Sequence, residues 1–142
     1  MMDKVVIIDL EGVLANNAWR SHLPPDWETY YKASIDDKTY PVTALLVRLL
    51  CLSMQIAIVT TTSERYRGIV NEWLNRNLIP GHKLIMRPED DWSSEVIFKQ
   101  SVVERIFAGH NIELVLDDNA EVVEMYRKLG LNCHLVTNNV RE

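Results

Sequence analysis

Asp9 and Glu11 are two carboxylates placed two residues apart, directly after the apolar run Lys4–Ile8. If the backbone stays extended there, both side chains point the same way, and Gly12 permits a tight turn immediately afterwards. Such a pair can supply a nucleophile and a general acid/base. Acids beside turns are also common without a catalytic role, so this interpretation needs support from the rest of the chain.

A second acidic pair, Asp117 and Asp118, ends the apolar run Ile112–Leu116. Adjacent carboxylates at the end of a strand suit a hard cation such as Mg²⁺. Asp118 has a second interpretation, as the N-cap of a helix that carries Glu121 as its capping-box partner. The two roles of Asp118 are compatible, whereas Asp117 ends the strand and has only the first.

Four hydroxyl residues, Thr60–Ser63, stand between an expected strand and an expected helix. Free backbone N–H groups and the helix dipole favour an anion at such a point. We assign a phosphate contact to Thr60, the first hydroxyl after the strand, and helix capping to either Thr62 or Ser63.

Lys99 and Arg20 are candidate cations for such an anion. Lys99 lies on an expected helix, with Glu95 at the spacing of an i,i+4 ion pair, although a lone lysine more often lies on a solvated helix face. Arg20 follows the first acidic pair by a short loop, where an arginine is either a surface residue or a planar phosphate ligand. Aromatic residues in or beside loops indicate either local packing or stacking on a base; they are Trp19, Trp27, Tyr30, Tyr31 and Trp92.

The composition indicates a soluble globular chain with room for one domain. Of 142 residues, 47% are hydrophobic and 25% charged, and the formal net charge is −5. These values exclude disorder and a membrane span. They also argue against a broad nucleic-acid-coating surface, while a small basic pocket stays open. Cys51 and Cys133 are expected to be buried thiols in a reducing compartment, and with no secretion signal the expected location is cytoplasmic.

Strands and helices are expected to alternate along the chain. Expected strands cover 4–9, 55–60, 83–86, 112–117 and 131–136, and expected helices cover 27–33, 41–53, 63–75, 94–107 and 119–129. The helix 41–53 has apolar residues at helical spacing; they are Val42, Leu45, Leu46, Leu49 and Leu50. Buried strands that alternate with helices pair in parallel. The expected fold class is therefore α/β, a three-layer, doubly wound, five-stranded parallel sheet with its chemistry outside the carboxyl ends of the strands.

Together these positions resemble the haloacid dehalogenase (HAD) superfamily of phosphotransferases, which has a Rossmann-like fold. Over nearly the whole chain they are most similar to the 3′-phosphatase domain of phage-type polynucleotide kinase/phosphatases; each motif is weak alone, but four in order at strand ends are specific. The resemblance implies that Asp9 is the nucleophile of an aspartyl-phosphate intermediate and Glu11 the general acid/base. Thr60 and Lys99 would hold and neutralise the phosphoryl group. The implied cofactor is Mg²⁺, with Asp9, Glu11 (through its backbone carbonyl), Asp117 and Asp118 as its ligands.

Two positions depart from the family pattern. Glu11 replaces the second Asp of an Asp-x-Asp motif, and Thr61-Thr62 stands where the family often has Gly-Arg. Arg65 is the candidate to replace that arginine. The residues expected to bind substrate are therefore Arg20, Thr61, Thr62 and Arg65.

The resemblance predicts a single HAD-like phosphatase domain over 1–142 with a minimal, cap-like insertion around 13–40. Three functions stay open at this point. The first is a magnesium-dependent phosphatase acting on nucleic-acid 3′ ends or nucleotides, the second is a small-metabolite phosphatase of the same fold, and the third is a degenerate, non-catalytic binding module. The expected partner is a phosphorylated small molecule or a nucleic-acid 3′ end, with no membrane partner, and the oligomeric state stays open.

Overall fold

A five-stranded parallel sheet forms the centre of the computed structural model, which describes residues 3–138. Its strands are β1 (Lys4–Asp9), β4 (Gln55–Ser63), β5 (Lys83–Arg87), β6 (Asn111–Asp117) and β7 (Cys133–Leu135), in the spatial order β5-β4-β1-β6-β7. The segments 5–8 of β1 and 56–59 of β4 are continuously apolar and are buried on both faces, as strands in a covered parallel sheet are. The expected fold class is confirmed.

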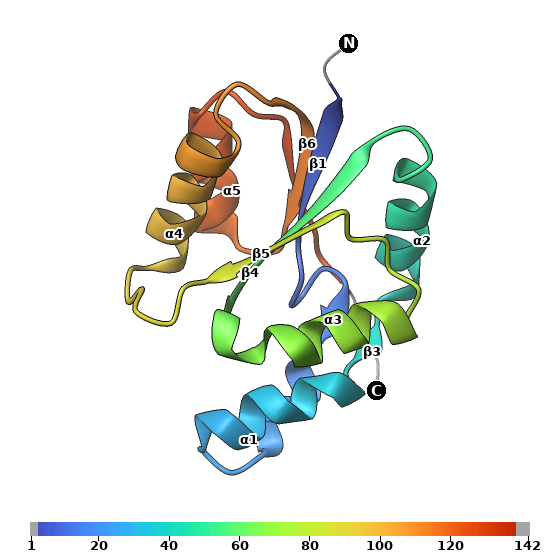
Figure 1. Cartoon of the computed structure of the whole chain (residues 1–142), viewed down its shortest axis with the longest axis vertical. Coiled ribbons are helices and arrows are strands. Elements are labelled where there is room, and N and C mark those ends of the chain that lie inside the picture. The colour runs from blue at the N-terminus through green and yellow to red at the C-terminus, as the bar shows by residue number, and fades with distance from the viewer. Residues whose placement is uncertain (1–2, 139–142) are drawn as a thin grey trace.

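Helices cover both faces of this sheet, as Figure 1 shows. They are α2 (Pro41–Leu50) and α3 (Arg67–Arg76) on one face, and α4 (Glu95–Ser101) and α5 (Ala120–Lys128) on the other. One core lies between the sheet and α2 and α3, where it includes Val47 and Trp73. The second core lies on the opposite face and includes Phe98 and Tyr126. The two apolar layers fix the positions of the strand ends.

The order of the strands reverses at β1. From β1 the chain moves outward to β4 and then β5, and it returns to β6 and β7 on the other side. A crevice forms between two neighbouring parallel strands when the connections that follow them run to opposite sides of the sheet. Asp9 ends β1 and Asp117 ends β6, so both acids lie at this switch point.

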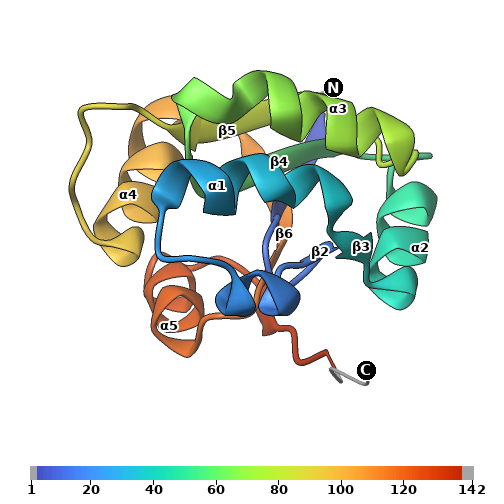
Figure 2. The same cartoon turned by 90° about the horizontal axis from the view of Figure 1, so that it is seen from below.

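The segment between β1 and α2 forms a small cover beyond the carboxyl ends of the strands. It contains α1 (Trp27–Lys32) and the antiparallel pair of β2 (Ala15–Asn16) and β3 (Lys38–Thr39). Short 3-10 turns at Ala18–His22 and Ala33–Asp36 flank α1. Viewed from below, α1 crosses in front of the strand ends (Figure 2). The sequence predicted α1 but neither the two short strands nor the 3-10 turns.

The hydroxyl residues after Thr60 belong to a strand, not to a loop. β4 continues to Ser63, where the chain pairs again with Arg87 after an irregularity between Thr60 and Ser63. A 3-10 turn over Glu64–Tyr66 follows, so α3 begins at Arg67 instead of 63. Ser63, and not Thr62, caps this turn, because its Oγ accepts a hydrogen bond from the backbone N–H of Arg65.

Two other sequence predictions need correction. Asn119, not Asp118, is the N-cap of α5, and its Oδ1 accepts hydrogen bonds from the N–H groups of Glu121 and Val122. In α2 most of the large apolar stripe faces solvent; Val42, Leu45, Leu46 and Leu49 are exposed. The opposite side of α2, with the smaller Thr43, Ala44 and Val47, packs against the sheet because small side chains allow a close approach.

The remaining helix ends differ modestly from the prediction. The helix expected over 94–107 is α-helical to Ser101 and continues as a π-helical turn over Val102–Ile106.

Cys133 is buried and Cys51 half-buried, and both are free thiols. Within residues 3–138, every helix is too short or too polar to span a bilayer.

Candidate active site

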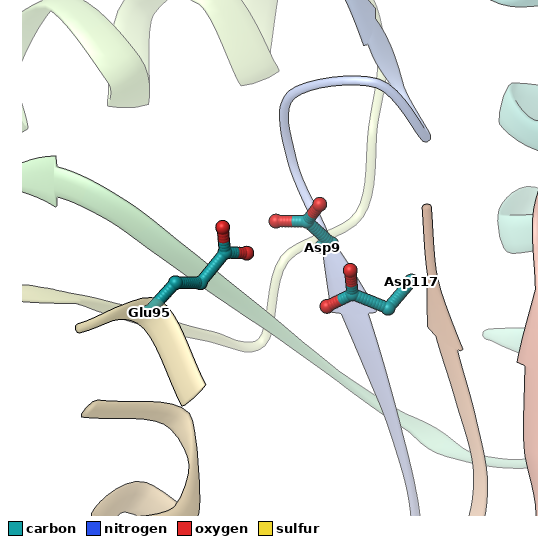
Figure 3. Close-up of side chains that lie close together, drawn as sticks. All are labelled: Asp9, Glu95 and Asp117. Carbon is teal, nitrogen blue, oxygen red and sulfur yellow. The ribbon is translucent and has the colours of Figure 1, made fainter. Parts of the chain in front are cut away.

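Three acids converge on one lysine at the carboxyl ends of β1 and β6. The Nζ of Lys99, from α4, lies 2.6 Å from Asp117 Oδ2, 2.9 Å from Glu95 Oε2 and 3.1 Å from Asp9 Oδ1. Figure 3 shows the three carboxylates pointing toward one another from β1, α4 and β6. Lys99 is fully buried, so its interpretation as a solvated helix residue is wrong, while the predicted pair with Glu95 is confirmed. Three carboxyl groups face one ammonium group, so the cluster holds more acids than cations.

Burial and crowding oppose ionisation of Asp9. Burial is the largest effect and raises the pKa of Asp9 well above its ordinary value; repulsion by Asp117 and Glu11 adds to it, whereas Lys99 opposes it. Burial likewise raises the pKa of Asp117 against the opposing effect of Lys99. For Lys99, burial disfavours the charge, but the surrounding carboxylates outweigh it and raise the lysine pKa. Additional positive charge in the site would favour the carboxylate that a nucleophile requires.

Asp118 lies on the cavity side of this cluster, close to Asp9. The neighbouring Asp118 carboxyl group contributes to the raised pKa of Asp9, after burial and the nearby charges. Gly12 makes room for this approach: its φ is +84°, and a Cβ there would overlap the Asp118 carboxylate. Both the turn and the close contact therefore require glycine at position 12.

The donor set fits a hard divalent cation. Asp9, Glu11 and Asp118 line one cavity with carboxylate oxygens, the ligands that Mg²⁺ prefers. Carboxylate oxygens of Asp9, Glu95 and Asp117 also lie within 4.8 Å of one another. Asp117, however, is already engaged, since Oδ2 accepts from Lys99 and Oδ1 accepts from the N–H of Asn119 at 3.0 Å. Among the four predicted ligands, Asp117 therefore lies on the lysine side, Glu11 and Asp118 lie on the cavity side, and Asp9 contacts both.

Glu11 is held by two hydroxyl groups. Thr62 Oγ1 donates to Glu11 Oε1 at 2.6 Å, and Thr60 Oγ1 donates to Oε2 at 2.7 Å. The N–H of Thr62 in turn donates to Thr60 Oγ1 at 3.1 Å, so the three groups form one network. Thr60 is fully buried and directs its hydroxyl proton to Glu11. The two positions that depart from the family pattern, 11 and 62, are therefore in direct contact.

The cavity in front of Asp9 has a volume of about 430 Å³. The segment between β1 and α2 forms one wall with Asn17, Tyr30 and Tyr31, and the sheet side contributes Thr61 and Thr62 among others. Asn17 and Asn119 line the cavity but were not predicted from the sequence. The sequence did contain a signal for both asparagines, because each follows an acidic pair at the end of a strand by only a few residues.

Arg20 is buried and fully engaged. Its Nε and Nη2 donate to Asp37 Oδ1 and Oδ2 at 2.9 and 2.8 Å, and its Nη1 donates to the carbonyl of Tyr30 at 3.2 Å. Its guanidinium also lies 4.4 Å from the centroid of the Tyr30 ring. Arg20 lines the cavity, and its burial excludes the alternative that it is a surface residue. Arg65 lies outside this cavity and lines the neighbouring one.

Comparison with known families identifies this arrangement. The family model for the phosphatase domain of polynucleotide kinase PNKP, a HAD family, matches residues 3–140. The chain belongs to this HAD phosphatase-domain family. The expected resemblance is thereby confirmed, and the family's fold agrees with the sheet and helices described above.

Solved structures share the fold at low sequence identity. A chain in the structure of the Pnkp1/Rnl/Hen1 RNA repair complex has a TM-score of 0.83 and 24% identity, covering 99% of this chain and 44% of that chain. This chain thus spans less than half the length of that relative. A class C acid phosphatase from Bacillus anthracis with tungstate bound has a TM-score of 0.72 and 11% identity, covering 99% and 69%. A HAD family enzyme from Bacteroides thetaiotaomicron, in complex with magnesium and inorganic phosphate, has a TM-score of 0.56 and 14% identity, covering 99% and 96%.

Proposed function

We propose that this chain is a magnesium-dependent phosphomonoesterase that acts through an aspartyl-phosphate on Asp9. The observation that carries the proposal is the position of Asp9, which lies in the wall of the cavity while the buried cation of Lys99 holds its other side. Membership of a phosphatase-domain family supports the same chemistry. Perturbed carboxyl groups of this kind cluster at functional sites.

In the first step an Asp9 carboxylate oxygen attacks phosphorus, and the bond from phosphorus to the ester oxygen breaks. Glu11 gives a proton to the departing alcohol oxygen. Lys99 stabilises the anionic form of Asp9, and Thr61 and Thr62, at the end of β4, line the cavity where the phosphoryl oxygens would lie. The products of this step are the free alcohol and the aspartyl-phosphate.

In the second step Glu11, now a carboxylate, takes a proton from water. The oxygen of that water attacks phosphorus, the bond between phosphorus and Asp9 breaks, and inorganic phosphate leaves. Both steps require Glu11 to keep one orientation. The hydroxyls of Thr60 and Thr62 are positioned to provide it, since each donates to a different oxygen of the carboxylate.

The residues suited to hold Mg²⁺ are Asp9, Asp118 and residue 11, at the cavity side of the cluster. When bound there, the ion supplies positive charge that offsets repulsion between the Asp9 carboxylate and a phosphate ester. The buried excess of negative charge around Lys99 supports this assignment.

We further propose that the substrate is a 3′-phosphate end of a nucleic acid, or a nucleotide. The family supports this substrate class, as does the fold shared with a chain of an RNA repair complex. The segment 13–40 then acts as a small cap on a single phosphatase domain, and it leaves the cavity open at one side for a polymer end.

The proposal is tested by hydrolysis of p-nitrophenyl phosphate, 3′-phosphorylated oligonucleotides, mononucleotides and sugar phosphates, each with Mg²⁺ and with chelator. We expect magnesium-dependent turnover and a preference for the 3′-phosphorylated ends. Turnover that persists in chelator would reject the magnesium assignment, and a preference for sugar phosphates would reject the substrate class. If no ester is hydrolysed under any condition, the chain is not a phosphatase.

A further inference from the structure

A second cavity, of about 570 Å³, opens beside the candidate active site. The two cavities share Tyr31 and Thr61 in their walls. The second lies between α1, the 3-10 turn at Glu64–Tyr66 and the loop 88–94 that joins β5 to α4. A group covalently attached to a phosphate in the first cavity can therefore extend directly into the second.

Three aromatic rings form a continuous stack along one wall of the second cavity. The ring centroids of Trp27 and Tyr31 are 6.0 Å apart with an interplanar angle of 25°, and those of Tyr31 and Tyr66 are 5.0 Å apart at 27°. Trp27 is 71% exposed. A stack that ends in an exposed indole offers a flat apolar surface to which another planar ring can add.

Trp92 lines the same cavity from the loop 88–94 and is 91% exposed. The backbone on either side of it is anchored: Arg87 donates to the carbonyl of Ser93 at 2.7 Å, and Asp91 Oδ1 accepts from the N–H and Oγ of Ser93. An anchored loop that keeps an indole in water gains no packing energy from it. Local packing therefore does not explain Trp92, whereas contact with a ligand does.

Arg65 supplies a cation to this cavity. Its side chain is 63% exposed, and within residues 3–138 its ion-pair partner is Glu28, at 4.0 Å. Arg87 also lines the cavity, but its guanidinium holds the loop 88–94 and the carbonyl of Thr61. The acids Glu89 and Asp91 lie in the same wall. Positive and negative groups are thus balanced, so ring stacking, with one accessible arginine, dominates recognition.

We propose that the second cavity binds the unpaired nucleotides that precede the 3′-phosphate of a single-stranded nucleic acid. Their bases contact the rings of Trp27 and Trp92, and a backbone phosphate pairs with Arg65. The inference rests on the proposed function, because that function places the terminal phosphate in the neighbouring cavity. Stacking uses the face of any base, so this site tolerates different sequences but requires unpaired bases.

The test measures binding of a 5′-labelled, 3′-phosphorylated pentathymidylate by fluorescence anisotropy, in an Asp9→Asn background that prevents turnover. We expect Trp92→Ala to weaken binding about 5- to 150-fold, the range for loss of stacking on one base, and Trp92→Tyr to retain most of the affinity. Leu52→Ala is the matched control, because Leu52 is also a highly exposed apolar residue but lies outside both cavities, and it leaves binding unchanged. Arg65→Gln weakens binding and reduces the salt dependence by about 0.7 in log K per log [salt], as for one phosphate contact.

A second probe leaves the protein unaltered and so does not depend on how the variants fold. The same oligonucleotide with abasic sugars at its last positions is expected to bind the protein with Trp92 intact at least as weakly as the normal probe binds Trp92→Ala, because stacking on both Trp27 and Trp92 is lost. Equal affinity for both probes, or wild-type affinity in both Trp27→Ala and Trp92→Ala, would overturn the proposal.

The outcomes also separate this inference from the proposed function. If the oligonucleotide binds no more tightly than thymidine 3′-phosphate while Asp9-dependent hydrolysis is intact, the second cavity is not a nucleic-acid site and the phosphatase proposal stands. If binding depends on Trp92 but no ester is hydrolysed, the nucleic-acid site stands and the phosphatase proposal fails.

Discussion

Arg20 and Lys99 are two fully buried cations that differ in how many carboxyl groups surround them. The guanidinium of Arg20 meets one carboxylate, Asp37, in a bidentate pair whose side chains are 1% and 2% exposed. Trp19 Nε1 donates to the same carboxylate at 2.8 Å, and Trp73 Nε1 donates to the backbone carbonyl of Asp37 at 2.8 Å. Charge is balanced here: the ion pair holds the segment 13–40 together, and the hydrogen bond from Trp73 attaches that segment to α3.

The Lys99 site has one cation and three carboxylates. A buried group of charges that does not balance costs stability, because desolvation of the surplus charge is not compensated. Folds retain such an arrangement where function requires it. The difference teaches that the balance of charge, more than burial itself, separates the structural ion pair from the candidate catalytic cluster in this molecule.

The largest expected effect is the loss of turnover in Asp9→Asn, by about 10⁴-fold or more, because the nucleophile is gone. The melting temperature of the metal-free protein is expected to hold or rise, since the substitution removes one of the crowded negative charges. Steady-state hydrolysis of p-nitrophenyl phosphate and thermal unfolding check both. Glu124→Gln, an exposed acid on α5, is the control, and wild-type turnover in Asp9→Asn would reject the catalytic assignment.

Removing either buried cation is expected to destabilise the fold strongly. Lys99→Met and Arg20→Met should each lower the free energy of unfolding by about 3–5 kcal/mol, because each leaves buried carboxylates without a partner. Urea unfolding at neutral pH measures the loss.

A double variant, in which the paired acid is replaced as well, distinguishes the two sites. Arg20→Met with Asp37→Leu should recover most of the lost stability, since an apolar pair replaces a balanced ion pair. Lys99→Met with Asp117→Leu should recover little, because Asp9 and Glu95 remain unpaired. Equal recovery at both sites would show that the charge balance of the two clusters does not differ in the way proposed.

Thr62→Val is expected to lower kcat about 10- to 100-fold, because Glu11 loses one of the two hydroxyls that orient it. Thr62→Ser keeps the hydroxyl and should retain most activity. Acid-quench trapping should show more aspartyl-phosphate in Thr62→Val, since Glu11 activates the water of the second step. Glu11→Asp should also slow turnover, because a side chain shorter by about 1.5 Å cannot reach both hydroxyls. Full activity in Thr62→Val would contradict the orienting role.

The smallest effect concerns pH. The folded protein binds a proton on Asp9 more tightly than the unfolded chain does, because its pKa is raised above the ordinary 3.8. This group therefore stabilises the fold below that pH, and its contribution is lost as pH rises toward the folded pKa, at up to about 1.4 kcal/mol per pH unit.

The checking measurement is the difference in unfolding free energy between wild type and Asp9→Asn, in chelator, from pH 4 to 8. Wild type is expected to lose stability relative to the variant as pH rises. Parallel curves for the two proteins would contradict the raised pKa.

The sequence by itself determined the five-stranded sheet, the ends of β1 and β6, and the family. Buried parallel strands need continuous apolar runs, so β1, β4 and β6 are visible as such in the sequence. Parallel topology then brings their carboxyl ends to one edge, so the apolar runs alone predict that Asp9, Thr60 and Asp117 lie near one another.

Only the tertiary structure decided which partner each of those side chains contacts. Hydrogen bonds between residues 18 to 51 positions apart join Lys99 to Asp117 and Glu11 to Thr60 and Thr62. Local patterning cannot specify which of two adjacent acids faces the lysine and which the cavity, because that depends on side-chain direction and on space such as that above Gly12. The same holds for α2, where both helix faces are apolar and only close packing of the smaller side chains selected the buried one.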